Sequence, residues 1–308
     1  MPLARSLLLR AADNDWLARQ MSERAFARRA VRRFMPGETL EAALVAAQSL
    51  AAQGLGTLLT QLGEGLTDER QAAEVRDHYL GAFDRIAHER LPTAVSIKPT
   101  QLGLDFSFDV CKRHLAALAD RAEATGSRLW IDMEDSRYVD RTLDLYRATL
   151  ERHPRAGLAI QSYLRRTPAD IEALIPLSPT IRLVKGAYQE PATVAFAEKR
   201  ETDLAYFAVG RRLLEAAADG RGLPVFGTHD MVLVNRLVDA ARELGVPDDR
   251  YEIHMLYGIG SSNQHALKQQ GRTVKTLISY GAAWFKWYMR RLAERPANVW
   301  FVMKSVFS

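Results

Sequence analysis

The feature that most constrains the fold is a repeated alternation of short apolar segments with longer helical ones. The short segments are rich in β-branched residues and lie at residues 57–62, 93–97, 128–133, 158–163, 180–184, 223–226, 251–256 and 273–278. Stretches with helical periodicity separate them, for example residues 108–124, 140–151, 192–218 and 231–244. The predicted strands start 22 to 43 residues apart, which is about the length of one strand–helix unit.

Eight strands that alternate with helices form either an open doubly wound sheet or a closed barrel. Residues 58–308 span 251 residues, close to the roughly 250 of a (βα)8 barrel. An open dinucleotide-binding sheet would carry G-x-G-x-x-G after its first strand, but residues 62–67 read LGEGLT. The sequence therefore predicts an α/β fold, a (βα)8 TIM-type barrel with N-terminal helices, and residues 37–308 as the barrel domain.

The positive charge is concentrated at one end of the chain. The formal net charge of +5 is already reached within residues 1–33, which hold eight arginines against three acidic residues. A nucleic-acid-binding domain would carry its basic residues on the folded body, so no nucleic-acid partner is expected. The spacing of Trp16, Met21 and Phe26 predicts an amphipathic helix within a basic extension, residues 1–36. This helix either packs on the barrel or attaches to anionic lipid or an acidic partner.

The remaining composition points to the cytoplasm. The single cysteine, Cys111, cannot form an internal disulfide, and the first apolar stretch, residues 7–9, is too short for a secretory signal. Residues 40–60 are alanine-rich but contain charged and amide side chains, so they do not predict a membrane span.

Polar side chains follow the predicted strands. They are Glu64, Lys98, Asp132, Glu134, Asp135, Gln161, Arg182, Lys185, Thr228, His229, Asp230, Tyr257 and Tyr280. Barrel enzymes place their sites at the carboxyl ends of the strands, so this ring predicts a functional mouth. The cations among these residues suit a carboxylate or a phosphate, although Lys98 or Lys185 could instead form a Schiff base.

A metal site and an amino-acid clamp are two further candidates. Divalent-ion ligands are available in Asp132, Glu134, Asp135, His229 and His254, but without helix-borne ligand spacing, so capping and charge pairing are favoured and no metal is predicted. The last predicted helix, residues 282–293, carries Trp284, Trp287, Arg290 and Arg291, with Glu294 following. Paired guanidinium groups beside an aromatic ring predict a clamp for an amino-acid carboxylate, or alternatively a surface pair between Arg290 and Glu294.

Six motifs resemble the proline dehydrogenase family, particularly its single-function bacterial members. They are SIKPTQLGLD at 96–105, IDMED at 131–135, RLVKGAY at 182–188, GTHD at 227–230, MLYG at 255–258 and RRLAERP at 290–296. The resemblance runs from about residue 35 to residue 302. It implies a barrel whose mouth binds FAD without a Rossmann domain and which oxidises L-proline to Δ1-pyrroline-5-carboxylate by hydride transfer.

The resemblance also implies roles for individual residues. The FAD-binding positions are Gln161, Arg182, Val184, Lys185, Gly186, Thr228 and His229, with Arg182 near the reactive flavin nitrogen. The catalytic positions are Lys98, Asp132, Arg290 and Arg291, and Lys98 and the two arginines hold the substrate carboxylate. The rest of the substrate pocket consists of Tyr188, Leu256, Leu277, Tyr280, Trp287 and Glu294.

The sequence departs from the family around the substrate ring. The last strand of the family commonly ends Tyr-Val-Pro-Tyr-Gly, whereas residues 277–281 read LISYG. Leu277 removes a phenol, and Trp287 adds bulk where the family usually has tyrosine. An altered ring pocket leaves open hydroxyproline or another secondary or larger amino acid as substrate.

Alternatives of another class are a non-flavin barrel lyase, a metal enzyme and a non-catalytic flavin-binding protein. Family members commonly reduce membrane quinones, so a quinone is the expected electron acceptor. Residues 1–33 are then the expected contact with the cytoplasmic face of a membrane.

Overall fold

The computed structural model describes residues 31–63 and 66–294, with side chains as far as Met289. Eight parallel strands close into a barrel in sequence order, and β8 pairs with β1. The strands are β1 (Gly56–Gln61), β2 (Thr93–Ile97), β3 (Leu129–Ile131), β4 (Gly157–Gln161), β5 (Thr180–Val184), β6 (Leu223–Gly227), β7 (Glu252–Leu256) and β8 (Val274–Tyr280). The predicted (βα)8 barrel is therefore confirmed.

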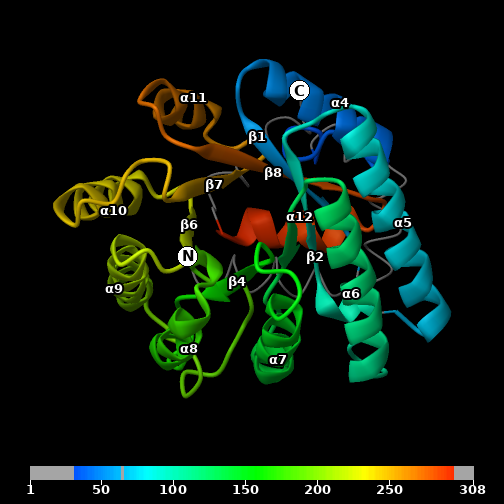
Figure 1. Ribbon diagram of the computed structural model, residues 1–308, viewed down its shortest axis with the longest axis horizontal. Helices are drawn as coiled ribbons and strands as arrows, with labels where there is room; N and C mark the ends of the chain where they lie inside the picture. The colour runs from blue at the N-terminus through cyan, green and yellow to red at the C-terminus, as the bar shows by residue number, and fades with distance from the viewer. Residues whose placement is uncertain (1–30, 64–65, 295–308) are drawn as a thin grey trace.

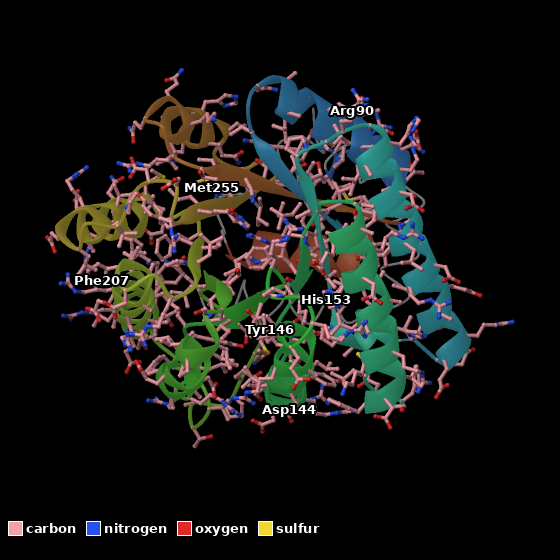
Figure 2. The ribbon with its side chains drawn as sticks, in the orientation of Figure 1. Arg90, Asp144, Tyr146, His153, Phe207 and Met255 are labelled. Carbon is pink, nitrogen blue, oxygen red and sulfur yellow. The ribbon has the colours of Figure 1, made fainter. Side chains whose placement is uncertain are left out.

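Helices cover the outside of the barrel (Figure 1). They are α4 (Leu40–Ala52), α5 (Glu69–His88), α6 (Phe108–Ala124), α7 (Val139–Leu150), α8 (Thr167–Leu174), α9 (Lys199–Ala218), α10 (Met231–Glu243) and α11 (Ser261–Gln269), while α12 (Trp284–Glu294) crosses the centre of the ring in this view. Short 3-10 turns follow β2 (Pro99–Leu102), β3 (Ser136–Tyr138) and α8 (Ile175–Leu177). Each outer helix turns an apolar face to the strands: Figure 2 shows Tyr146, which is fully buried, on the barrel side of α7 and Asp144 at its outer rim.

Side-chain caps explain where several helices begin. The side chains of Thr39, Asp68, Ser107 and Asp230 each accept a hydrogen bond from a backbone N–H in the first turn of the following helix. Such caps satisfy N–H groups that have no partner inside the helix. The predicted helix over residues 192–218 was wrong in its first part, because residues 192–198 form a loop and α9 begins at Lys199.

The described end of the basic extension lies against the last helix. Val31, Phe34 and Met35 are buried in one cluster with side chains of α12, including Trp284. The backbone at Arg33 passes so close to Gly258 that a Cβ there would lie 1.6 Å from the Arg33 carbonyl oxygen. Gly258 also has a φ of +72°, which favours glycine. The amphipathic helix predicted from Trp16, Met21 and Phe26 lies outside the described residues.

The barrel interior contains a large aromatic ring in a layer of aliphatic side chains. Trp130 of β3 is fully buried and clusters with Leu58, Ala94 and Val225 from three other strands. Room for the indole exists because the next strand carries Gly157, where a Cβ would lie 2.4 Å from Trp130 Cε3. The interior is therefore shaped by a glycine and a tryptophan on adjacent strands.

The pair of Gly157 and Trp130 predicts the effect of adding one methyl group. Gly157→Ala should destabilise the fold by about 1–3 kcal/mol, because the new Cβ overlaps the indole in a packed layer. Denaturant unfolding measures this change. Gly81→Ala is the matched control: Gly81 is exposed in α5, a Cβ there meets nothing within 4 Å, and about 0.5–1 kcal/mol of stabilisation is expected. Equal effects of the two variants would contradict the described packing.

Candidate active site

A buried ion pair spans the mouth of the barrel. Arg182 of β5 is 4% exposed, and its Nη2 donates hydrogen bonds to Asp132 Oδ1, which follows β3, and to Ser96 Oγ of β2 at 3.0 Å. The Ser96 hydroxyl in turn donates to Asp132 Oδ1 at 2.9 Å. Three strands thus meet through one guanidinium group, and the structure brings the predicted site residues Arg182 and Asp132 together.

The positive charge of Arg182 is held with little access to water. Burial lowers the pKa of the guanidinium, while Asp132 opposes that shift, and an arginine stays protonated in a protein. Its second terminal nitrogen, Nη1, is buried and has no hydrogen-bond partner among the described residues. A buried cation with an unused donor suits an electron-rich ligand at the mouth.

Loops after β2 and β3 are joined beside this pair. Glu134 accepts hydrogen bonds from the Thr100 backbone N–H at 3.0 Å and from its hydroxyl at 2.7 Å. Burial raises the pKa of Glu134, and the contacts with Thr100 and the charge of Lys98 oppose that rise. Lys98 itself is half-buried at the end of β2, where it precedes the turn that carries Thr100.

On the opposite side of the mouth, Lys185 and His229 have fixed partners. Lys185 Nζ donates to Asp203 Oδ1 at 2.5 Å and to Asp230 Oδ2 at 2.8 Å. His229 Nε2 accepts a hydrogen bond from the Leu256 backbone N–H at 3.0 Å. The neutral imidazole therefore carries its proton on Nδ1. Thr228, the neighbour of His229, is buried and accepts from the Asp230 backbone N–H at 3.1 Å.

Between these two sides, the strand ends carry a buried polar atom without a partner among the described residues. They also carry glycines that lie close to neighbouring side chains. Gln161 is buried, its amide nitrogen donates to the Met133 carbonyl at 3.4 Å, and its Oε1 has no partner among the described residues. A Cβ at Gly227 would lie 2.8 Å from Val184 Cγ1. Gly186 has a φ of +114°, and a Cβ there would lie 2.2 Å from the ring of Tyr163, so its backbone conformation and packing both require glycine.

The predicted substrate residues separate into three groups. Leu256 and Leu277 are partly buried at the interior of the barrel, and Leu277 packs on the cluster that holds Trp130. Tyr188 is half-buried in the loop after β5, and Trp287 is half-buried on α12. The helix α12 includes Arg290, Arg291 and Glu294, but the structure does not describe their side chains.

Tyr280 does not lie with the substrate residues. Side chains alternate along β8, so that Tyr280 packs with Ile278 in the layer between the barrel and the helices. Its hydroxyl is hydrogen-bonded to His78 Nε2 of α5 at 2.7 Å, and its exposed fraction is 1%. The structure therefore corrects its assignment to the substrate pocket.

The candidate metal ligands each have a different partner. Asp132 pairs with Arg182, Glu134 with Thr100, Asp135 with Arg137, His229 with Leu256 and His254 with Glu252. Within residues 31–63 and 66–294, no group of three or more histidine, cysteine or acidic side chains is arranged to hold a metal ion.

Comparison with known proteins supplies the family. A family model described as proline dehydrogenase matches residues 43–304. Proline dehydrogenase 1 of Bacillus subtilis (strain 168) is 36% identical over 275 residues, which cover 89% of this chain and 90% of that protein. The chain belongs to the proline dehydrogenase family. Another relative, the proline dehydrogenase of Deinococcus radiodurans, is 32% identical over 279 residues, or 89% of each chain.

Solved structures of larger proteins contain the same barrel as this proline dehydrogenase family member. Proline utilization A (PutA) from Bdellovibrio bacteriovorus, inactivated by N-propargylglycine, superposes with a TM-score of 0.81 at 22% identity. PutA from Bradyrhizobium japonicum, mutant D779W, superposes with a TM-score of 0.75 at 26% identity. The superpositions cover 87% and 91% of this chain, which spans about a third of each PutA chain, 33% and 32%.

Three residues around the ion pair were not predicted as site residues from the sequence. Ser96 joins Asp132 to Arg182, and Trp130 lies beneath Arg182, with the guanidinium carbon 4.8 Å from the ring centroid. Glu134 was named only among the polar strand-end residues and the candidate metal ligands. The signal for Ser96 and Trp130 was their position two residues before Lys98 and Asp132. On a strand, residues i and i+2 share a face.

Removing the negative charge of Asp132 should destabilise this fold. Asp132→Asn keeps the shape but leaves the buried Arg182 charge uncompensated, and about 3 kcal/mol of destabilisation is expected. Urea unfolding of the protein without added ligand gives the value. The control is Asp144→Asn, which breaks an exposed pair with Arg147 and should change stability by less than about 1 kcal/mol. Similar costs for the two variants would rule out a compensating role for Asp132.

Proposed function

We propose that this member of the proline dehydrogenase family is a FAD-dependent enzyme that oxidises L-proline to Δ1-pyrroline-5-carboxylate. The observation that carries the proposal is the buried Arg182 cation at the barrel mouth, with Nη1 unused among the described residues. The 36% identity to a protein named proline dehydrogenase over almost its whole length supports the same reaction. The reaction acts on the CH–NH bond of the substrate.

The residues at the mouth fit a flavin. Buried polar atoms without partners, Arg182 Nη1 and Gln161 Oε1, are suited to the polar edge of a planar heterocycle. Gly227 keeps the end of β6 free of a side chain beside Val184. The proposed cofactor-binding residues are Gln161, Arg182, Val184, Lys185, Gly186, Thr228 and His229. A bound flavin supplies a hydride acceptor for the carbon next to the substrate nitrogen.

The protein's part is to fix charges around that transfer. Arg182 holds a positive charge where negative charge develops during hydride transfer, and Asp132 and Ser96 keep the guanidinium in place. Lys98, Arg290 and Arg291 bind the substrate carboxylate. Each charge-assisted hydrogen bond contributes roughly 1.5–3 kcal/mol, so three of them retain a small zwitterion that buries little apolar area.

Substrate choice depends on the side chains around the ring. Leu256, Leu277, Tyr188 and Trp287 are the proposed contacts, and the partly buried Leu277 lies on the Trp130 cluster. A leucine at this position has no hydroxyl and a smaller surface than a tyrosine. The second candidate function is therefore the same chemistry on hydroxyproline or on another secondary or larger amino acid.

The electrons are proposed to pass to a membrane quinone, as the resemblance to the family implies. Among the described helices none combines the length and the apolar composition of a membrane span. We assign the contact to the arginine-rich residues 1–33, because they attract anionic lipid headgroups electrostatically.

Anaerobic mixing with single amino acids tests the proposed reaction. The purified protein should carry FAD, and L-proline should bleach its absorbance faster than hydroxyproline or larger amino acids do. A faster reaction with one of those compounds would favour the second candidate. A colourless protein that cannot be reconstituted with FAD would contradict both. A flavoprotein bleached by no amino acid in the panel would instead be a non-catalytic flavin-binding protein.

Restoring a tyrosine tests the role of Leu277. Leu277→Tyr should raise kcat/KM for proline relative to bulkier substrates by about tenfold, because a filled pocket rejects extra atoms at roughly 1–3 kcal/mol. Ile278→Val on the same strand, which faces the helices, is the control and should leave the ratio unchanged. An unchanged ratio in Leu277→Tyr would show that this position does not set substrate specificity.

A further inference from the structure

The Arg182 guanidinium is held unevenly by its hydrogen bonds. Both bonds, to Asp132 and to Ser96, come from the same nitrogen, Nη2. A group held at one nitrogen keeps freedom to tilt about that point. The second support is the indole of Trp130, whose ring centroid lies 4.8 Å from the guanidinium carbon. At this distance a cation is attracted to the face of an aromatic ring, most strongly when water is excluded.

The Trp130 ring also contacts a hydrogen-bonded group of side chains on β7 and β8. The His254 ring meets Trp130 edge-on, with centroids 5.3 Å apart. His254 Nε2 is bonded to Glu252 Oε2 at 2.8 Å, and the other oxygen of Glu252 accepts from Lys275 Nζ at 2.8 Å. All three polar residues are interior side chains near the end of the barrel opposite the mouth. Contacts among side chains therefore join four strands: β5 (Arg182), β3 (Trp130), β7 (His254 and Glu252) and β8 (Lys275).

A positive charge on His254 would repel Arg182, but the groups around the imidazole keep it neutral. The groups that face it are Glu252, which favours its protonation, and Arg182 and Lys275, which disfavour it. Burial is the largest effect and lowers the pKa of His254 to about 4. The neutral ring then donates Nε2–H to Glu252 and presents an uncharged edge to the indole.

Simple space filling does not account for Trp130. Branched aliphatic side chains commonly fill this part of a barrel, and they bury no polar atom. The indole Nε1–H of Trp130 is buried without a hydrogen-bond partner among the described residues, which is unfavourable by roughly 1–3 kcal/mol. The neighbouring strand must also carry Gly157 to make room for the ring. A flat π surface beneath the guanidinium is what an aliphatic side chain lacks.

We propose that Trp130, supported by His254 and Glu252, is a positioning residue that fixes the tilt of the Arg182 guanidinium toward the flavin. The inference rests on the proposed function. A guanidinium held in one orientation stabilises negative charge on the reduced cofactor better than one that moves. Trp130 therefore raises the reduction potential of the bound flavin and the rate of hydride transfer without contacting the substrate.

Potentiometry on three variants of the FAD-loaded protein tests this role. In Trp130→Leu, the equilibrium for flavin reduction should weaken about tenfold, which is a potential about 30 mV more negative for a two-electron couple. kcat should fall about tenfold while KM for proline changes less than twofold. Trp130→Phe, which keeps a weaker π face, should give smaller changes in the same direction. The matched control is Phe226→Leu, a buried change on the outer face of β6, which should shift neither quantity.

Other results would overturn the proposal. An unchanged potential in Trp130→Leu, or an equal shift in Phe226→Leu, would show that Trp130 acts only through packing. If Trp130→Leu does not fold, Trp130→Phe and His254→Gln carry the same comparison. A double-mutant cycle between Trp130→Phe and Arg182→Lys, followed by thermal unfolding of flavin-free protein, should be non-additive, and additivity would also overturn the pairing. Failure of the proposed function is distinct, because it shows in the unmodified protein, which would then bind no FAD or would not be bleached by any amino acid.

Discussion

The burial of one guanidinium group is the constraint on which the site depends. Arg182 projects from β5 into the barrel, where a charge without a partner is strongly unfavourable. Asp132 supplies the opposite charge from β3, and Ser96 supplies a hydroxyl from β2 that contacts both. These contacts form only when the strands are in their observed register. The closure of the barrel therefore also places the positive charge of Arg182.

The barrel interior holds a second charged group, and the ring of Trp130 separates it from the pair of Arg182 and Asp132. Glu252 accepts from Lys275 and His254; burial raises its pKa, but these partners outweigh burial and hold the pKa well below its usual value. Trp130 lies between the two groups and contacts both. In each group a carboxylate lies beside its cations: Asp132 beside Arg182, and Glu252 beside Lys275 and Arg128, whose Nη1 lies 3.7 Å from Glu252 Oε1. Such preorganised charge is the larger part of what a protein contributes to hydride transfer.

Periodicity predicted the fold because each strand and helix has its own local pattern. The predicted bounds of β2, β5 and α6 agree with the structure, and the others differ mainly at their ends. The loop at residues 192–198 was missed because its alanines continue the helical composition of α9. The polar strand ends and the family motifs predicted Arg182, Asp132 and Lys185 as site residues, and the structure brings the first two together.

Contacts across the barrel were harder to predict, because they depend on which strands face each other and in which register. Ser96 and Trp130 became recognisable as neighbours of Arg182 only once β2, β3 and β5 were placed. Tyr280 illustrates the opposite error. Its place at a strand end suggested the mouth, but the two-residue alternation that puts Leu277 inside puts Tyr280 against His78 of α5.

A crystal structure of the protein with FAD and an unreactive proline analogue tests whether Arg182 binds the flavin ring. The distance to measure is that from Arg182 Nη1 to the nearest polar atom of the flavin ring. We expect a hydrogen bond, about 3 Å long, with the guanidinium still stacked on Trp130 and bonded to Asp132. A flavin ring bound elsewhere, or an Arg182 side chain that leaves Trp130 when the cofactor is bound, would contradict it.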